Sequence, residues 1–249
     1  MLCKHLGINS FFFCNFVCIN SVVMIEICCN SLQSARNARQ GGATRVELCH
    51  NLEVGGVTPT EEDIRSCVAM GLRTHVLVRP RGGDFCYSDA ECAMIKHQVA
   101  RCKALGAHAV VVGFLHQDGS IDVERTAEIV RLAAPMEVTF HRAFDECANP
   151  LQALEQIIAC GCHRILTSGC APSALEGIPL LRQLVTQAAG RIIILAGAGV
   201  TPDNAAYILQ ATGVQEIHGS CKHTLPDGTI ETDGILVEKL INQITENEK

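Results

Sequence analysis

The stretch VTFHRAFDE, residues 138–146, joins an apolar segment to a cluster of titratable side chains. Its first three residues are β-branched or aromatic and are typical of a buried strand. The next positions bring His141, Arg142 and Asp145 together within five residues. A strand of this kind is typical of barrels in which the strand interior packs and the carboxyl-terminal tip carries the chemistry. The stretch therefore predicts a buried strand with a functional tip.

The same alternation of short apolar runs and helical segments extends along the chain from residue 23 onward. Eight strand–helix units in about 225 residues are typical of a single (β/α)₈ TIM barrel. No GxGxxG turn follows the first strand, which weakens the alternative of an open, doubly wound sheet. The predicted strands are residues 23–28, 44–49, 74–79, 108–113, 136–141, 163–167, 191–196 and 214–218.

Helix start and stop signals separate these strands. Ser88 and Glu91 form a capping box in front of a helix predicted at about 89–105. Elsewhere a capping residue precedes a proline at the first helical position, or a glycine follows the last helical residue. These further signals are Asn149-Pro150 and Thr201-Pro202 for helix starts, and Gly41, Gly106 and Gly161 for helix ends.

Composition excludes some classes of partner. A net charge of −6 argues against nucleic acid, because binding phosphate backbones requires a basic surface. The 15 cysteines are scattered, and the absence of a CxxC…CxxC pattern argues against a structural zinc site. An odd number of cysteines in a chain with a large core indicates free thiols in a reducing cytoplasm.

Residues 1–23 differ from the rest of the chain. Their apolar patch loosely resembles a signal peptide, but Asn15 interrupts it and no small-residue cleavage site follows. The segment is too short and too polar to span a bilayer, so we expect no membrane association. The prediction is a barrel domain over residues 24–249, preceded by an atypical extension outside the fold.

Strand alternation predicts which side chains enter the barrel. Ile27 and Leu48 suit the layer that faces the helices, so their neighbours on the same strands face inward. Buried carboxylates need partners, and the candidates are arginines at strand starts and in the loops. The inward set is then either a structural ion network or part of a functional rim. The predicted inward residues are Glu26, Cys28, Glu47, Cys49, Thr139, His141, Glu216 and His218, and the candidate arginines are Arg45, Arg79, Arg81, Arg142, Arg164 and Arg191.

Glycine-rich turns late in the chain suggest an anion site. Exposed backbone N–H groups there could hold an anion, as phosphate sites in such barrels do, although glycine also simply permits tight turns. His141 and Asp145 are the acid/base candidates for an enzyme, with Glu26 or Glu47 orienting them. The candidate anion-binding residues are Arg79, Arg81, Arg142, Ser168, Gly169, Gly197 and Gly199.

Cys28 and Cys49 end neighbouring strands, where both sulfur atoms could reach one soft ion. Thiolates favour Cu(I) and zinc, and coordination by two thiolates suits Cu(I). Among 15 cysteines, such a pair could also be coincidental. His50, His141 or His218 could complete a site, with His218 the preferred addition, while no HExxH spacing supports a catalytic zinc.

Seven motifs follow one another along the chain: IEICCNS (25–31), ATRVELCHNLEVGGVTPT (43–60), VRPRGGDFCYSDAE (78–91), VTFHRAFDECANP (138–150), RILTSGCAPSALEG (164–177), LAGAGVTPDN (195–204) and EIHGS (216–220). Together they resemble the CutC family of copper homeostasis proteins. The resemblance implies a (β/α)₈ barrel, a cytoplasmic location, self-association as a dimer or tetramer, and copper tolerance with Cu(I) bound through cysteines that match Cys28 and Cys49. It implies no settled enzymatic reaction. Thr44 departs from the family pattern, and a shorter segment after His218 predicts a more open eighth side of the barrel.

Three hypotheses about function follow. The leading one is a cytosolic copper homeostasis protein that binds Cu(I) through Cys28 and Cys49. The second is a barrel enzyme that acts on a small anionic substrate, for example a phosphorylated one, at the barrel mouth. The third is a scaffold whose cysteines take up copper only when the metal is abundant.

Overall fold

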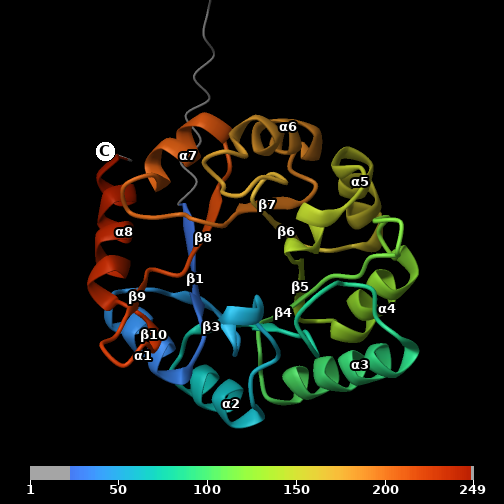
Figure 1. Ribbon diagram of the computed structural model, residues 1–249, viewed down its shortest axis with the longest axis horizontal. Coiled ribbons are helices and arrows are strands. Elements are labelled where there is room, and N and C mark those ends of the chain that lie inside the picture. Colours follow the sequence, from blue (N-terminus) through green and yellow to red (C-terminus); the bar gives the residue numbers. More distant parts are fainter. Residues whose placement is uncertain (1–22, 248–249) are drawn as a thin grey trace, which may run out of the picture.

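Eight parallel strands close into a barrel in the computed structural model, which describes residues 23–247 (Figure 1). Each strand pairs with its neighbour in sequence, and β1 pairs with β8 to close the ring. The strands are β1 (Met24–Cys29), β2 (Arg45–Leu48), β3 (Arg73–Leu77), β4 (Ala109–Val112), β5 (Glu137–Phe140), β6 (Arg164–Thr167), β7 (Ile193–Ala196) and β8 (Glu216–Gly219).

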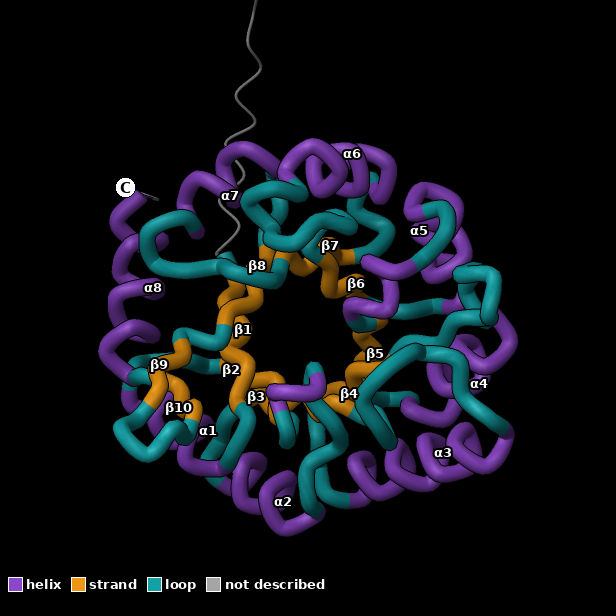
Figure 2. The backbone as a smooth tube through the Cα atoms, in the orientation of Figure 1, coloured by secondary structure: helices purple, strands orange, loops and turns teal. Residues whose placement is uncertain are grey.

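Helices form an outer ring around the barrel, and a small hairpin follows β8 (Figure 2). The hairpin pairs β9 (Lys222–Thr224) with β10 (Ile230–Thr232), and β10 packs against α1. The helices are α1 (Leu32–Gln40), α2 (Glu61–Ala69), α3 (Asp89–Ala104), α4 (Val123–Ala133), α5 (Pro150–Cys160), α6 (Ile178–Ala188), α7 (Ala205–Thr212) and α8 (Gly234–Asn247), with short 3₁₀ turns η1 (Leu52–Val54) and η2 (Arg142–Glu146).

The side chains of each strand alternate between two apolar environments. Ile27 and Leu48 are fully buried in the large core between strands and helices. Cys28 and Cys49 belong instead to a small cluster inside the barrel, together with Leu77 and Val111. The alternation predicted from sequence is therefore confirmed for β1 and β2.

All eight predicted strands are present, each within two residues of its expected start or end. The capping box of α3 is confirmed, because Ser88 and Glu91 bond each other's backbone N–H groups. Asn149 caps α5, with Pro150 at the first helical position as expected. The predicted fold class is confirmed.

One predicted helix start is wrong. Thr201-Pro202 does not open α7, which begins at Ala205 with Asn204 as the preceding cap residue. The Asn204 side chain accepts a hydrogen bond from the Thr201 N–H at 2.8 Å. This bond stabilises a turn in front of the helix, and local sequence signals do not separate such a turn from a helix start.

Residues 1–23 were predicted to form an extension outside the fold. This prediction is not tested, because residues 1–22 lie outside the residues that the structure describes. Between residues 23 and 247, no helix combines the length and hydrophobicity needed to cross a bilayer.

Candidate metal centre at the barrel mouth

Glu26 is the hub of an ion network inside the barrel. Its carboxylate, 1% exposed, lies 3.1 Å from Arg45 Nε, 2.6 Å from His75 Nδ1 and 2.9 Å from His218 Nδ1. Burial alone would raise the pKa of Glu26, but the histidines and Arg45 outweigh it and hold that pKa well below its ordinary value. Glu26 is therefore an ionised carboxylate that orients its neighbours.

A second layer of charges lies in the barrel interior at the amino-terminal ends of the strands. Glu216 Oε2 accepts from Arg45 Nη2 at 2.5 Å and from Arg164 Nε at 2.9 Å. Arg164 also pairs with Glu137, which contacts Arg73 at 2.6 Å. Burial opposes ionisation of Glu137, yet Arg164 and Arg73 lower its pKa to about 2. These contacts satisfy the buried charges, which supports a structural ion network for this layer.

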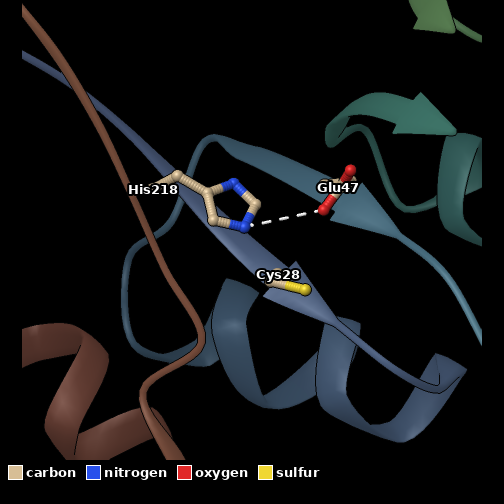
Figure 3. A group of neighbouring side chains, drawn as sticks. All are labelled: Cys28, Glu47 and His218. Atoms are coloured by element: carbon tan, nitrogen blue, oxygen red, sulfur yellow. Dashed lines mark ion pairs between the residues drawn. The ribbon is translucent and has the colours of Figure 1, made fainter. Parts of the chain in front are cut away.

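The carboxyl-terminal ends of β1, β2 and β8 bring together three potential metal ligands. One ligand atom from each of Cys28, Glu47 and His218 lies within 4.8 Å of the others. Figure 3 shows the three side chains converging, with His218 Nε2 at 3.6 Å from Glu47 Oε2. Cys49 is not one of these three, but it packs against Cys28 inside the barrel, and a hydrogen bond from its side chain contributes to the raised pKa of Cys28. Cys28 also lies opposite Glu47 in the strand register, so the fold itself determines these positions.

The protonation of the cluster follows from burial and from mutual contacts. The hydrogen bond with Cys49, followed by burial, raises the pKa of Cys28 well above its ordinary value. Burial also raises the pKa of Glu47. Burial would lower the pKa of His218, but contacts with Cys28, Glu26 and Glu47 raise it well above its ordinary value. These directions favour a protonated His218 beside a neutral Cys28 thiol, so metal binding through either group would release its proton.

A cavity of about 720 Å³ lies directly above this cluster. Its walls include apolar side chains such as Leu77 and Phe85, and basic groups such as Lys222. This volume is within the range of small-molecule sites. The cluster is therefore reachable from the barrel mouth although its side chains are buried. The wider lining includes Cys28, Glu47, Cys49, Arg79, His141, Arg142, Gly199 and His218.

His141, an acid/base candidate, lines this cavity. Its Nδ1 accepts the Ala143 N–H at 3.1 Å, while its buried Nε2 has no partner among the described residues. Burial and the charge of Arg79 lower its pKa to about 3, so the ring is neutral and its proton is on Nε2. A Cβ on Gly113 would come within 2.5 Å of the ring, so this glycine makes room for His141.

Asp145, the other acid/base candidate, lies outside the cavity lining. Its carboxylate accepts from Thr167 Oγ1, from the Ser168 and Cys170 N–H groups at 3.0 and 3.1 Å, and from Arg142 Nε at 2.7 Å. These contacts hold the loop after β6 against η2. They give Asp145 a structural role.

The predicted anion-binding arginines have internal partners. Arg79 donates to the carbonyls of Val54, Gly56 and Gly83, and its guanidinium stacks over Phe85. Arg81 lies outside the cavity lining and pairs with Glu91 at 2.6 Å and Asp84 at 3.0 Å. Both side chains stabilise the loop after β3.

The predicted anion-binding turns are only partly at the cavity. The N–H of Ser168 donates to Asp145, and that of Gly169 to Thr167 Oγ1 at 2.9 Å. Gly197 donates its N–H to the Thr167 carbonyl at 3.0 Å. Of the seven predicted anion-binding residues, those that line the cavity are Arg79, Arg142 and Gly199.

Sequence reasoning missed three members of the ion network, Arg73, His75 and Glu137. His75 and Glu137 are on inward-facing positions of β3 and β5, and the strand parity applied to β1 and β2 would have identified both. The prediction that Arg191 is a partner of the buried carboxylates is wrong, because Arg191 pairs with Glu155 and both side chains are largely exposed. His50 pairs with Asp63 at 2.9 Å and does not line the cavity.

The fold and the site define a (β/α)₈ barrel protein with a thiol, carboxylate and imidazole cluster below a cavity at the carboxyl-terminal ends of its strands. A model of the CutC family matches residues 23–223. The chain therefore belongs to the CutC family.

Individual relatives agree with this assignment. A CutC family protein of Chromobacterium violaceum is 48% identical over 200 residues, which cover 80% of this chain and 81% of the relative. A mouse protein named copper homeostasis protein cutC homolog is 44% identical, with 82% of this chain and 76% of the relative covered. The crystal structure of a CutC protein from Streptococcus agalactiae matches with a TM-score of 0.76 at 33% identity, covering 80% of this chain and 98% of that one.

Proposed function

We propose that this protein takes part in copper homeostasis and binds Cu(I) at the barrel mouth through Cys28 and Cys49. One observation carries the proposal. The two thiols contact each other at the end of neighbouring strands, at the base of a cavity and beside an imidazole nitrogen. The name of the mouse relative, copper homeostasis protein cutC homolog, supports the same function.

The donor set suits a soft monovalent ion. Thiolates select Cu(I), for which coordination by two sulfur atoms is sufficient. His218 brings a ring nitrogen within 4.8 Å of the Cys28 sulfur, while its Nδ1 contacts the Glu26 carboxylate at 2.9 Å. A carboxylate in this position fixes the ring orientation and increases the basicity of a metal-ligating histidine. Glu47 is the remaining neighbour, and its oxygen is a poorer match for Cu(I).

The cellular setting is part of the proposal. All twelve cysteines within residues 23–247 are free, which suits a reducing compartment such as the cytoplasm. We also expect the protein to form a homo-oligomer, as the family resemblance implies. Size-exclusion chromatography with light scattering would measure its state.

A competition titration tests the metal site. The reduced protein is titrated anaerobically with Cu(I) in the presence of a Cu(I) chelator, beside the double variant Cys28→Ser/Cys49→Ser. A second double variant, Cys67→Ser/Cys102→Ser, changes two buried thiols of the helical layer and serves as the control. The proposal predicts that only the first variant loses one tight equivalent. Equal losses from both would instead indicate incidental uptake by many thiols.

A second candidate function, catalysis on a small anionic substrate, is favoured by the upper part of the same cavity. His141 lines this cavity and has a buried Nε2 without a partner among the described residues, and the cationic side chains of Arg142 and Lys222 line the same cavity. An imidazole N–H and two cations could hold a carboxylate or phosphate group. His141→Gln and Lys222→Ala should both weaken binding of inorganic phosphate in calorimetry. Unchanged weak binding in both variants would contradict this function.

A further inference from the structure

A second pair of thiols lies at the surface, outside the cavity. Cys147 follows η2, and Cys170 lies in the loop after β6. A side-chain hydrogen bond between the two thiols lowers the pKa of Cys147 and raises that of Cys170. Both residues are also anchored to the carbonyl of Phe144, which accepts from the Cys147 N–H at 3.2 Å and from the Cys170 thiol at 3.7 Å. The pair is therefore held together by two loops that the chain brings side by side.

Asp145 fixes the relative position of these two loops. Its carboxylate accepts from the backbone N–H of Cys170 at 3.1 Å and from that of Ser168 at 3.0 Å. Cys170 adopts a φ of +54°, in the left-handed region that non-glycine residues seldom occupy. The carboxylate bond holds it there, so the thiol of Cys170 is directed by a rigid turn.

The pair differs from Cys28 and Cys49 in its access to solvent. Cys28 and Cys49 are 8% and 1% exposed, whereas Cys170 is exposed and Cys147 is half-buried. A ligand-exchange partner can approach the exposed residue Cys170 directly from solvent, whereas it reaches Cys28 and Cys49 only through the cavity at the barrel mouth. Two adjacent thiols are also the donor set that Cu(I) prefers, and the ion does not need a third ligand.

We propose that Cys147 and Cys170 form a second Cu(I) site, accessible from solvent, which receives copper by exchange from a small thiol or chelator complex. Two S–Cu bonds form as two bonds between Cu(I) and the carrier break. The two cysteine protons leave to solvent or to the released carrier thiolates, and the ion remains Cu(I) throughout. The site is distinct from the proposed centre at Cys28 and Cys49, because it uses different residues on different loops.

Four proteins separate the two sites: the wild type, Cys28→Ser/Cys49→Ser, Cys147→Ser/Cys170→Ser, and the quadruple variant. Each full-length chain is reduced, kept anaerobic and titrated with Cu(I) against a Cu(I) chelator, and circular dichroism confirms that each is folded. We expect two equivalents for the wild type, one for each double variant and none for the quadruple variant. Stopped-flow transfer from the Cu(I)–chelator complex should be at least about tenfold slower in Cys147→Ser/Cys170→Ser, because only the buried site remains.

The outcomes distinguish this inference from the proposed function. An unchanged number of equivalents in Cys147→Ser/Cys170→Ser overturns the second site, whatever happens at Cys28 and Cys49. A loss in that variant with no loss in Cys28→Ser/Cys49→Ser supports the surface site and contradicts the buried one. If glutathione disulfide converts the surface pair to a disulfide while Cu(I) never binds it, the pair is a redox site and the inference fails.

Discussion

The thiol of Cys28 differs from other buried thiols in what surrounds it. Cys67 and Cys102 are buried among the apolar side chains of the helical layer. Cys28 instead contacts the thiol of Cys49 and lies close to the imidazole of His218. A buried cysteine usually behaves as a small hydrophobe, so the neighbours rather than the burial distinguish this one.

Much of this residue-level arrangement could be predicted from strand parity. The alternation of β1 and β2 placed Glu26 and Cys28 inside the barrel, because successive side chains must point to opposite faces. The partners of Arg79 could not be predicted in this way. They are loop carbonyls, and their positions depend on how the loops after β2 and β3 pack together.

At this scale we predict that Glu26→Gln destabilises the protein and weakens copper binding together. The amide cannot balance Arg45 and the two histidines, and breaking a buried ion network typically costs about 3–5 kcal/mol. Loss of the carboxylate that orients His218 should also weaken Cu(I) binding about 10–100-fold. Urea unfolding and chelator competition measure the two effects.

Glu155→Gln is the matched control for this change. Glu155 pairs with Arg191 on the exposed surface, so its loss should leave both measurements nearly unchanged. A Glu26→Gln variant with wild-type stability and wild-type copper affinity would contradict the assigned role of Glu26.

The elements that shape the mouth are connected by side chains as well as by the barrel strands. Asp145 joins η2 to the loop after β6, and Arg79 joins the loops after β2 and β3. Sequence signals predicted the elements themselves because periodicity and capping act locally. The start of α7 was misplaced because the Asn204 side chain stabilises a turn that resembles a helix start in sequence.

For the connection between elements, we predict that Asp145→Asn lowers the free energy of unfolding by about 1.5–3 kcal/mol, the usual contribution of hydrogen bonds to a charged group. In the variant, the amide NH₂ group would face Arg142 Nε or the Ser168 N–H. Both are donors that now bond to a carboxylate oxygen, so at least one of these bonds would be lost. Hydrogen exchange should become faster at the Ser168 and Cys170 amides.

Asp118→Asn provides the comparison, because Asp118 is an exposed loop residue whose carboxylate also accepts a backbone N–H, from Ser120. It should change stability much less than Asp145→Asn. If Asp145→Asn folded as stably as the wild type but abolished a reaction at the mouth, the structural role would be wrong and a catalytic one supported.

The stability of the whole molecule should depend on pH through His141. Its pKa is lowered from 6.5 to about 3 on folding, so between these values the unfolded chain binds more protons than the folded one. This contribution to stability is therefore present above pH 6.5 and is lost as the pH falls toward 3. The slope from one such group is at most about 1.4 kcal/mol per pH unit.

The difference between the wild type and His141→Gln in urea unfolding between pH 5 and 6.5 isolates this effect. His108, Glu47 and His218 also have shifted pKa values, but they are present in both proteins. Glu137 titrates below that window, because its pKa falls from 4.5 to about 2 on folding. The stabilisation from His218, whose pKa is raised, is present at pH 5 and begins to fall as the pH approaches 6.5, so it gives a slope of opposite sign only at the upper end of this window. His141→Gln should flatten the profile, and an equally steep profile in this variant would disprove the assignment.

The barrel as a whole could be predicted from sequence because eight strand–helix units follow one another with regular helix signals. The meeting of Cys147 with Cys170 could not. It depends on the turn that Asp145 holds, which no local pattern encodes. Cys28, Glu47 and His218 could be placed together from sequence because regular strand alternation determines their positions. Cys147 and Cys170 lie in loops, where no such alternation applies.

The central claim is that Cu(I) is bound by Cys28 and Cys49 at the barrel mouth, and X-ray absorption at the copper edge tests it most directly. The protein would be Cys147→Ser/Cys170→Ser loaded with one equivalent of Cu(I), compared with the same background carrying Cys28→Ser/Cys49→Ser. We predict two sulfur ligands in the first sample and none in the second. An oxygen and nitrogen shell in the first sample, or the same sulfur shell in both, would contradict the claim.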